Sequence, residues 1–74
     1  MTTTPQETVT AAAADDPATG LRAIRALRDL ADRLEILQVG NARDRGWSWQ
    51  QIAEALGVTR QAVHKKHARS RRDR

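Results

Sequence analysis

The segment 59–67 carries guanidinium, amide, imidazole and ammonium side chains, which form hydrogen bonds with the edges of nucleic-acid bases. The amide of Gln61 matches adenine, and the cations of Arg60 and Lys65 match guanine. If the segment is helical, a step of about 100° per residue turns Val63 inward and leaves the polar groups on the outer side. We therefore expect a base-reading helix with contacts from Thr59, Arg60, Gln61, His64 and Lys65.

Basic charge is concentrated in the same part of the chain. Residues 60–74 hold seven Arg and Lys residues against one Asp, whereas residues 1–19 hold three acidic residues and no basic one. A basic end of this kind suits a polyanion, because phosphate neutralisation dominates non-specific DNA affinity. Phosphate contacts are expected from Ser48, Gln50, Gln51, Lys66, Arg69, Arg71 and Arg72. The alternative is a basic tail that is merely solvated.

The base-reading helix needs a second short helix that crosses it through a tight turn. Such a crossing requires a small residue where the helices touch and a turn residue that tolerates positive φ. Ala53 is placed for the contact and Gly57 for the turn. The apolar inner face would consist of Ile52, Leu56, Val58 and Val63.

Capping signals mark where both short helices begin. Ser48 followed by Gln51 is a capping box, and Thr59 is a good N-cap for a helix that starts at Arg60. One turn after Val63, however, a polar Lys66 and His67 stand where an apolar residue is expected, so the second helix would be weakly anchored on its own. Of the two tryptophans that flank Ser48, Trp47 and Trp49, one is expected to fill the core and the other to lie at its edge.

A long helix is predicted from about residue 21 to residue 45, capped by Thr19 or Gly20 and ended by Gly46. Four leucines share one side of it: Leu27, Leu30, Leu34 and Leu37. Ile36 and Val39 project from nearly the opposite side. One helix thus has two separate apolar surfaces, and each should have a partner.

Three arrangements would satisfy both surfaces. The leucine stripe (Leu27, Leu30, Leu34 and Leu37) can form a two-fold dimer interface while Ile36, Val39 and Ala42 pack on the two short helices. The assignment can also be reversed. Alternatively, the helix breaks near Gly40 and Asn41 and buries both surfaces within one monomer.

The predicted fold is therefore all-α with three helices, at about 21–45, 48–56 and 60–69. Residues 1–19 show no apolar periodicity and are expected to be a disordered tail, residues 20–69 the folded domain, and residues 70–74 a basic tail. The chain has no cysteine, so no disulfide reinforces its small core, and self-association is the remaining candidate. No secretory signal or membrane span is evident, and a cytoplasmic, nucleoid-associated protein is expected.

Catalytic and metal chemistry find no support in the sequence. His64 and His67 have a spacing that can bind a metal, but they stand among basic residues and lack a carboxylate or thiol to complete the ligand shell. Ser48 and Ser70 have no neighbouring base and acid. We expect no enzymatic activity, no cofactor and no small-molecule ligand.

From Leu34 to His67 the chain resembles a group of small actinobacterial helix-turn-helix proteins. The shared elements follow a leucine-rich helix and read Ala42-Arg43, Gly46-Trp47-Ser48-Trp49, Ile52-Ala53, Ala55-Leu56-Gly57-Val58 and Arg60 to Lys66. The resemblance implies a bacterial DNA-binding regulator. In related proteins the module also precedes a Clp N-terminal-like domain; none follows here, which suggests a free-standing regulator.

Together these features predict a protein that binds double-stranded DNA sequence-specifically and regulates transcription. It would bind an inverted repeat as a homodimer and insert the helix 60–69 into the major groove. The alternative is a helical protein-interaction module that uses the leucine stripe and has a non-specific basic tail.

Overall fold

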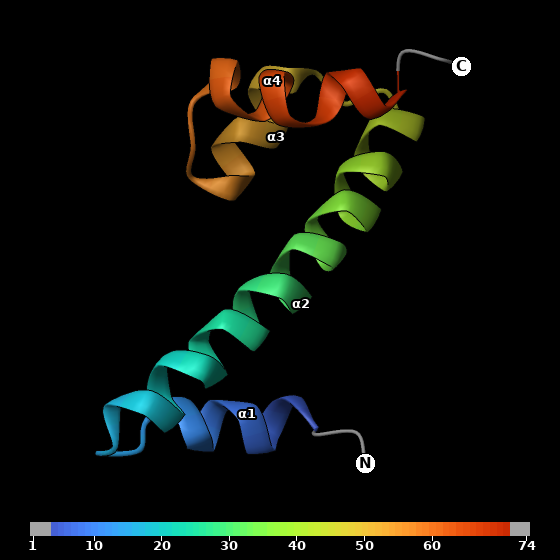
Figure 1. Cartoon of the computed structure of the whole chain (residues 1–74). Coiled ribbons are helices and arrows are strands. Elements are labelled where there is room, and N and C mark those ends of the chain that lie inside the picture. The colour runs from blue at the N-terminus through green and yellow to red at the C-terminus, as the bar shows by residue number, and fades with distance from the viewer. Residues whose placement is uncertain (1–3, 72–74) are drawn as a thin grey trace. The chain divides into compact units, whose positions relative to one another are not determined.

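The structure, a computed structural model, describes residues 4–71, with the backbone alone for residues 69–71. All regular elements in this stretch are helices: α1 (Pro5–Ala12), α2 (Pro17–Asp44), α3 (Trp49–Leu56) and α4 (Arg60–Arg71) (Figure 1). The all-α class is confirmed, but the predicted number of three helices is wrong. The described residues divide into two compact units, Met1–Leu34 and Glu35–Arg74, and we describe each by itself.

The additional helix, α1, lies in the segment expected to be disordered. Its start is set locally: Thr4 is the N-cap, its Oγ1 accepts from the N–H of Glu7 (3.1 Å), and Pro5 occupies the first turn. No residue of α1 is buried. Its sequence also lacks the apolar periodicity by which a packed helix is recognised. Capping and alanine propensity explain α1 better than core packing does.

The N-terminus of α2 also differs from the prediction, because Asp16 caps it instead of Thr19 or Gly20. The Oδ2 atom of Asp16 accepts from the hydroxyl (2.6 Å) and the N–H (3.0 Å) of Thr19, and these two bonds lower the pKa of Asp16. Pro17 then starts the helix four residues earlier than expected. Gly20 lies inside α2 and is buried where the backbone of α1 and the following turn come close to it.

The C-terminal part of α2 continues through Gly40 and Asn41 to Asp44. The predicted alternative in which the helix breaks at this point is therefore wrong. Gly46 follows with a φ of 85°, the left-handed conformation expected for a residue that ends a helix. None of the described helices is long and apolar enough to cross a membrane.

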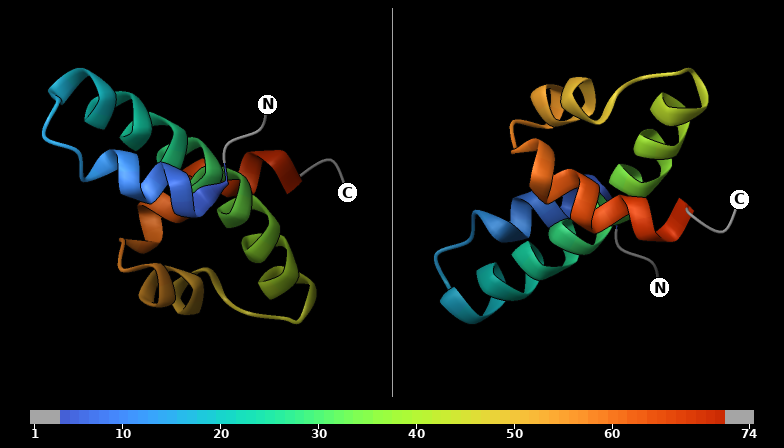
Figure 2. Two further views of the ribbon diagram at one scale, coloured as in Figure 1. Left: turned by 90° about the horizontal axis from the view of Figure 1, so that it is seen from below. Right: turned by 90° about the horizontal axis from the view of Figure 1, so that it is seen from above.

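Helices α3 and α4 form the predicted helix-turn-helix (Figure 2). The capping box is confirmed: the N–H of Ser48 donates to Gln51 Oε1 (2.8 Å), and the N–H of Gln51 donates to Ser48 Oγ (3.1 Å). Gly57 ends α3 with a φ of 73°. The N–H of Ala62 donates to Thr59 Oγ1 (3.0 Å), which caps α4 as expected.

The core of this unit is a cluster of four buried side chains, with Ala42 and Trp49 packed against it: Val39, Ile52, Ala53 and Val63. Leu56 and Val58 were expected in the inner face but are 41% and 49% exposed. They lie at the end of α3 and in the turn, and they border a pocket with Glu35 that is open to solvent. The inner face is therefore smaller than the sequence pattern predicts.

Candidate nucleic-acid interface

The outer side of α4 carries the residues predicted to contact bases. Val63 is 2% exposed and fixes which side of α4 faces the core. The predicted base-contacting residues are all exposed: Thr59, Arg60, Gln61, His64 and Lys65. The hydroxyl oxygen of Thr59 also caps the helix, and its hydroxyl hydrogen is available for a further bond. Four of the five side chains thus start from the first two turns of α4, the part of a recognition helix that meets base edges.

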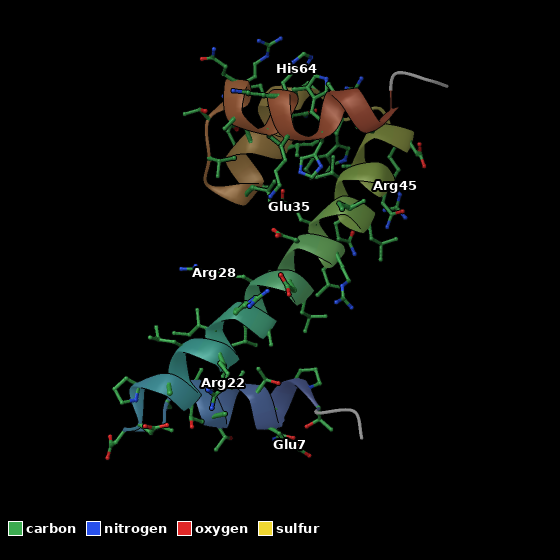
Figure 3. The ribbon with its side chains drawn as sticks, in the orientation of Figure 1. Glu7, Arg22, Arg28, Glu35, Arg45 and His64 are labelled. Atoms are coloured by element: carbon green, nitrogen blue, oxygen red, sulfur yellow. The ribbon has the colours of Figure 1, made fainter. Side chains whose placement is uncertain are left out.

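His64 is held against a tryptophan. Its ring lies edge-on to Trp49 with 5.3 Å between the ring centroids and 90° between the planes. Figure 3 draws His64 on the side of α4 that faces away from Glu35. Trp49 is the tryptophan that packs against the core, whereas Trp47 is 42% exposed. The position of the His64 ring is therefore set by α3 as well as by α4.

Trp49 also receives a cation from the end of α2. The guanidinium carbon of Arg43 lies 4.5 Å from the centroid of the Trp49 ring. Arg43 Nη1 also donates to the carbonyl oxygen of Trp47 (2.7 Å). Trp49 thus contacts both Arg43 and His64, and these contacts join α2, α3 and α4. The sequence did not single out Arg43 for any chemical role.

The predicted phosphate contacts at the start of α3 are already engaged in local bonds. Ser48 and Gln51 form the capping box, and Gln50 Nε2 donates to Glu54 Oε1 (3.1 Å). The Nε2 group of Gln51 still carries two N–H donors. Arg72 lies outside the described residues, as do the side chains of Arg69 and Arg71.

The polar position after Val63 is occupied by a buried histidine with a carboxylate partner. His67 is 3% exposed, and its Nε2 lies 2.5 Å from Glu35 Oε2 on α2. Because an ionised carboxylate only accepts hydrogen bonds, Nε2 of His67 is the donor. Lys66 Nζ lies 3.2 Å from the same oxygen. The helix predicted to be weakly anchored on its own, α4, is thus bonded to α2 through a polar cluster of Glu35, Lys66 and His67.

The cluster alters the titration of its carboxyl group. The hydrogen bond from His67 lowers the pKa of Glu35, partial burial opposes this, and Lys66 lowers the pKa further. The ionised form of Glu35 is therefore favoured by the contact with α4. Sequence reasoning missed Glu35, although it precedes Val39 by one helical turn and so lies on the side of α2 that faces the core.

Helix α2 contacts the helix-turn-helix through a narrow strip of Glu35, Val39 and Ala42. Ile36 was expected there but is 59% exposed, whereas Val39 is 3% exposed. The strip follows spacings of four and three residues, which leave Ile36 beside it. Val39 lies in the core with Ile52 and Val63, which excludes the predicted reverse arrangement in which Val39 would belong to the dimer interface.

The leucine stripe remains largely uncovered by the residues that the structure describes. Leu34 and Leu37 are 51% and 55% exposed, and Leu27 and Leu30 are partly exposed. Large exposed apolar side chains at helical spacing are typical of a contact surface.

The tight turn at Gly57, the capped helices on either side and the packing of α2 across them define a helix-turn-helix protein. A family model described as a homeodomain-like domain matches residues 21–73, and the chain belongs to this family. The match supports a DNA-binding module. No curated protein and no solved structure matches the chain.

Proposed function

We propose that this protein binds double-stranded DNA sequence-specifically and acts as a bacterial transcriptional regulator. The observation that carries the proposal is the outer side of α4, where Arg60, Gln61 and Lys65 are exposed while Val63 is buried. A helix presented in this way fits the major groove, which is wide enough to admit it and displays a distinct pattern of donors and acceptors for each base pair.

The charge distribution supports the same proposal. The five basic residues that follow Lys65 in segment 60–74 would neutralise phosphates on either side of the groove. Lys66 is partly compensated by Glu35, so we expect it to contribute less to phosphate binding than the arginines that follow. These contacts would set the register of α4, and the base contacts would set the sequence preference.

We further propose that the protein binds an inverted repeat as a homodimer through the leucine stripe. Two-fold symmetry would place two recognition helices about 34 Å apart, on successive major grooves. The exposure of Leu34 and Leu37 supports a partner for this surface. It equally favours the second candidate function, a protein-interaction module in which the leucine stripe binds a different protein.

In-vitro site selection with the purified protein distinguishes these functions. Enrichment of one short palindrome from a random duplex library would support both specific binding and two-fold symmetry. A single non-palindromic half-site would support specific binding by a monomer. If no sequence is enriched and binding to random duplex is weak, the interaction module is the better account.

A further inference from the structure

Arg43 is held in place before any ligand is bound. Its Nη1 donates to the carbonyl oxygen of Trp47, and its guanidinium carbon lies over the ring of Trp49. An exposed arginine normally loses much of its rotamer freedom when it binds an anion. Here part of that entropy has already been lost on folding, so anion binding by Arg43 would cost less.

The position of Arg43 connects it to both parts of the proposed interface. Trp49 is the first residue of α3, so the guanidinium lies beside the helix start whose cap is Ser48. Trp49 also contacts His64, on the outer side of α4. Arg43 therefore shares Trp49 as a neighbour with the base-reading residue His64, although Arg43 comes from α2.

The contacts of Arg43 leave some of its N–H donors available for a ligand. A guanidinium has five N–H donors, and the Trp47 carbonyl accepts from one nitrogen. The contact with the Trp49 ring is electrostatic and does not need a hydrogen bond from the guanidinium. Several donors thus remain for a phosphate oxygen.

From this geometry we propose that Arg43 is a DNA phosphate contact held in place by Trp49, which also positions His64 for base reading. The inference rests on the proposed function, since it assumes that the outer side of α4 binds DNA. It adds a contact from α2, outside the segment 48–67 that carries the reading motif. Trp49 is a positioning residue for the guanidinium of Arg43 and the imidazole of His64.

The test compares Arg43→Gln with Arg45→Gln. Both substitutions remove one positive charge, but Arg45 has no ring contact with Trp49 and borders a pocket with Leu56 and Ala55. The affinity of each variant for a random-sequence DNA duplex is measured by fluorescence anisotropy over a range of salt concentrations. Loss of one phosphate contact reduces the slope of log Kobs against log salt by about 0.9.

We expect this reduction for Arg43→Gln and an unchanged slope for Arg45→Gln. Between about 50 and 200 mM salt, wild-type affinity should then fall about 3.5-fold more than that of Arg43→Gln. Equal slopes for Arg43→Gln and wild type, or equal losses in both variants, would overturn the proposal. If wild type itself shows no salt-dependent binding to any duplex, it is the proposed function that fails.

A measurement on the unmodified protein covers the possibility that Arg43→Gln does not fold. The Nε–H resonance of Arg43 is followed by NMR while the random-sequence duplex is added. A phosphate contact should shift this resonance and slow its exchange with water. If the chemical shift of the Arg43 Nε–H stayed constant while those of α4 changed, Arg43 would have only a structural role and the phosphate contact would be refuted.

Discussion

Gln61 is the side chain on which base specificity should depend most clearly. It is exposed, it lies on the outer side of α4, and its amide can form two hydrogen bonds with adenine. Replacing Gln61 with Ala should relax the preference at one base pair by about 1–3 kcal/mol and leave most non-specific binding intact. The affinity is measured for the duplex enriched by in-vitro site selection and for the same duplex changed at that base pair.

Gln38→Ala is the matched control, because Gln38 is an exposed glutamine on α2. It should leave both affinities unchanged. If Gln61→Ala weakened binding to specific and random DNA equally, base reading through this residue would be refuted.

Glu35 should make stability depend on pH. Its pKa is lowered in the folded protein, chiefly by His67, so its contact with α4 stabilises the fold above the unfolded value of 4.5. This contribution is lost as pH falls through the lowered folded value. Glu35→Gln should destabilise the protein by about 1 kcal/mol at pH 7, because a hydrogen bond to a charged acceptor becomes one to a neutral amide.

Urea unfolding of wild type and Glu35→Gln between pH 7 and acid checks this prediction. The difference in unfolding free energy should vanish below the folded pKa of Glu35. Glu54→Gln removes the same charge from an exposed site on α3 and should change little. If the difference in unfolding free energy between wild type and Glu35→Gln persisted unchanged in acid, the ionised carboxylate would not be what stabilises the cluster.

At the level of single residues, what could be predicted followed from local rules. The outward placement of Gln61 and the capping roles of Ser48 and Thr59 depend only on helix geometry and nearby backbone groups. The partner of His67 could not be read in the same way. Glu35 lies 32 residues away, and only the fold brings it to the buried imidazole.

Among the helices and turns, two glycines should respond to replacement by alanine with opposite changes in stability. Gly57 ends α3 in the left-handed region, where a side chain costs roughly 1–2 kcal/mol. Gly20 lies inside α2, and an added Cβ would be 3.5 Å from the nearest backbone oxygen, an ordinary contact distance. Gly57→Ala should therefore destabilise the protein, and Gly20→Ala should be neutral or stabilise it by up to about 1 kcal/mol.

Thermal unfolding followed by circular dichroism measures both effects. Opposite shifts in Tm, or a fall for Gly57→Ala with no change for Gly20→Ala, would agree with the described backbone. A stabilised Gly57→Ala would show that the turn does not need positive φ and would contradict the turn geometry.

The helices also differ in how well a sequence reveals them. The α3–turn–α4 element was predictable because its caps, its turn glycine and its small contact residue all lie within 20 residues. Helix α1 was missed because its start depends on Thr4 and Pro5 and not on an apolar pattern. Ile36 was misplaced because hydrophobicity alone could not tell which neighbours of Val39 meet α3 and α4.

At the scale of the whole molecule, the leucine stripe predicts self-association. Leu34→Glu would place a charge in the middle of the proposed interface and should convert a dimer into a monomer of about half the mass. Ile36→Glu is the control, since Ile36 is similarly exposed but lies on another side of α2. Sedimentation velocity distinguishes the monomer expected for Leu34→Glu from the dimer expected for wild type and Ile36→Glu. A wild-type protein that stays monomeric at high concentration would exclude the interface.

Affinity for any duplex should depend on the basic end of the chain. Deleting residues 69–74 removes four arginines and one aspartate. The deletion should weaken binding to every sequence and flatten its salt dependence, because fewer counterions are released. The ratio of specific to random affinity should stay nearly constant. A selective loss of specific binding would instead place base contacts in this segment.

Amide chemical-shift mapping by NMR, with duplex DNA added to the full chain, tests the central claim most directly. If the N-terminal half of α4 enters the major groove, the largest shifts should fall on Arg60 to Lys65, with smaller ones at the start of α3. Shifts confined to the leucine stripe of α2, or to the basic end beyond residue 68, would contradict DNA reading by this helix.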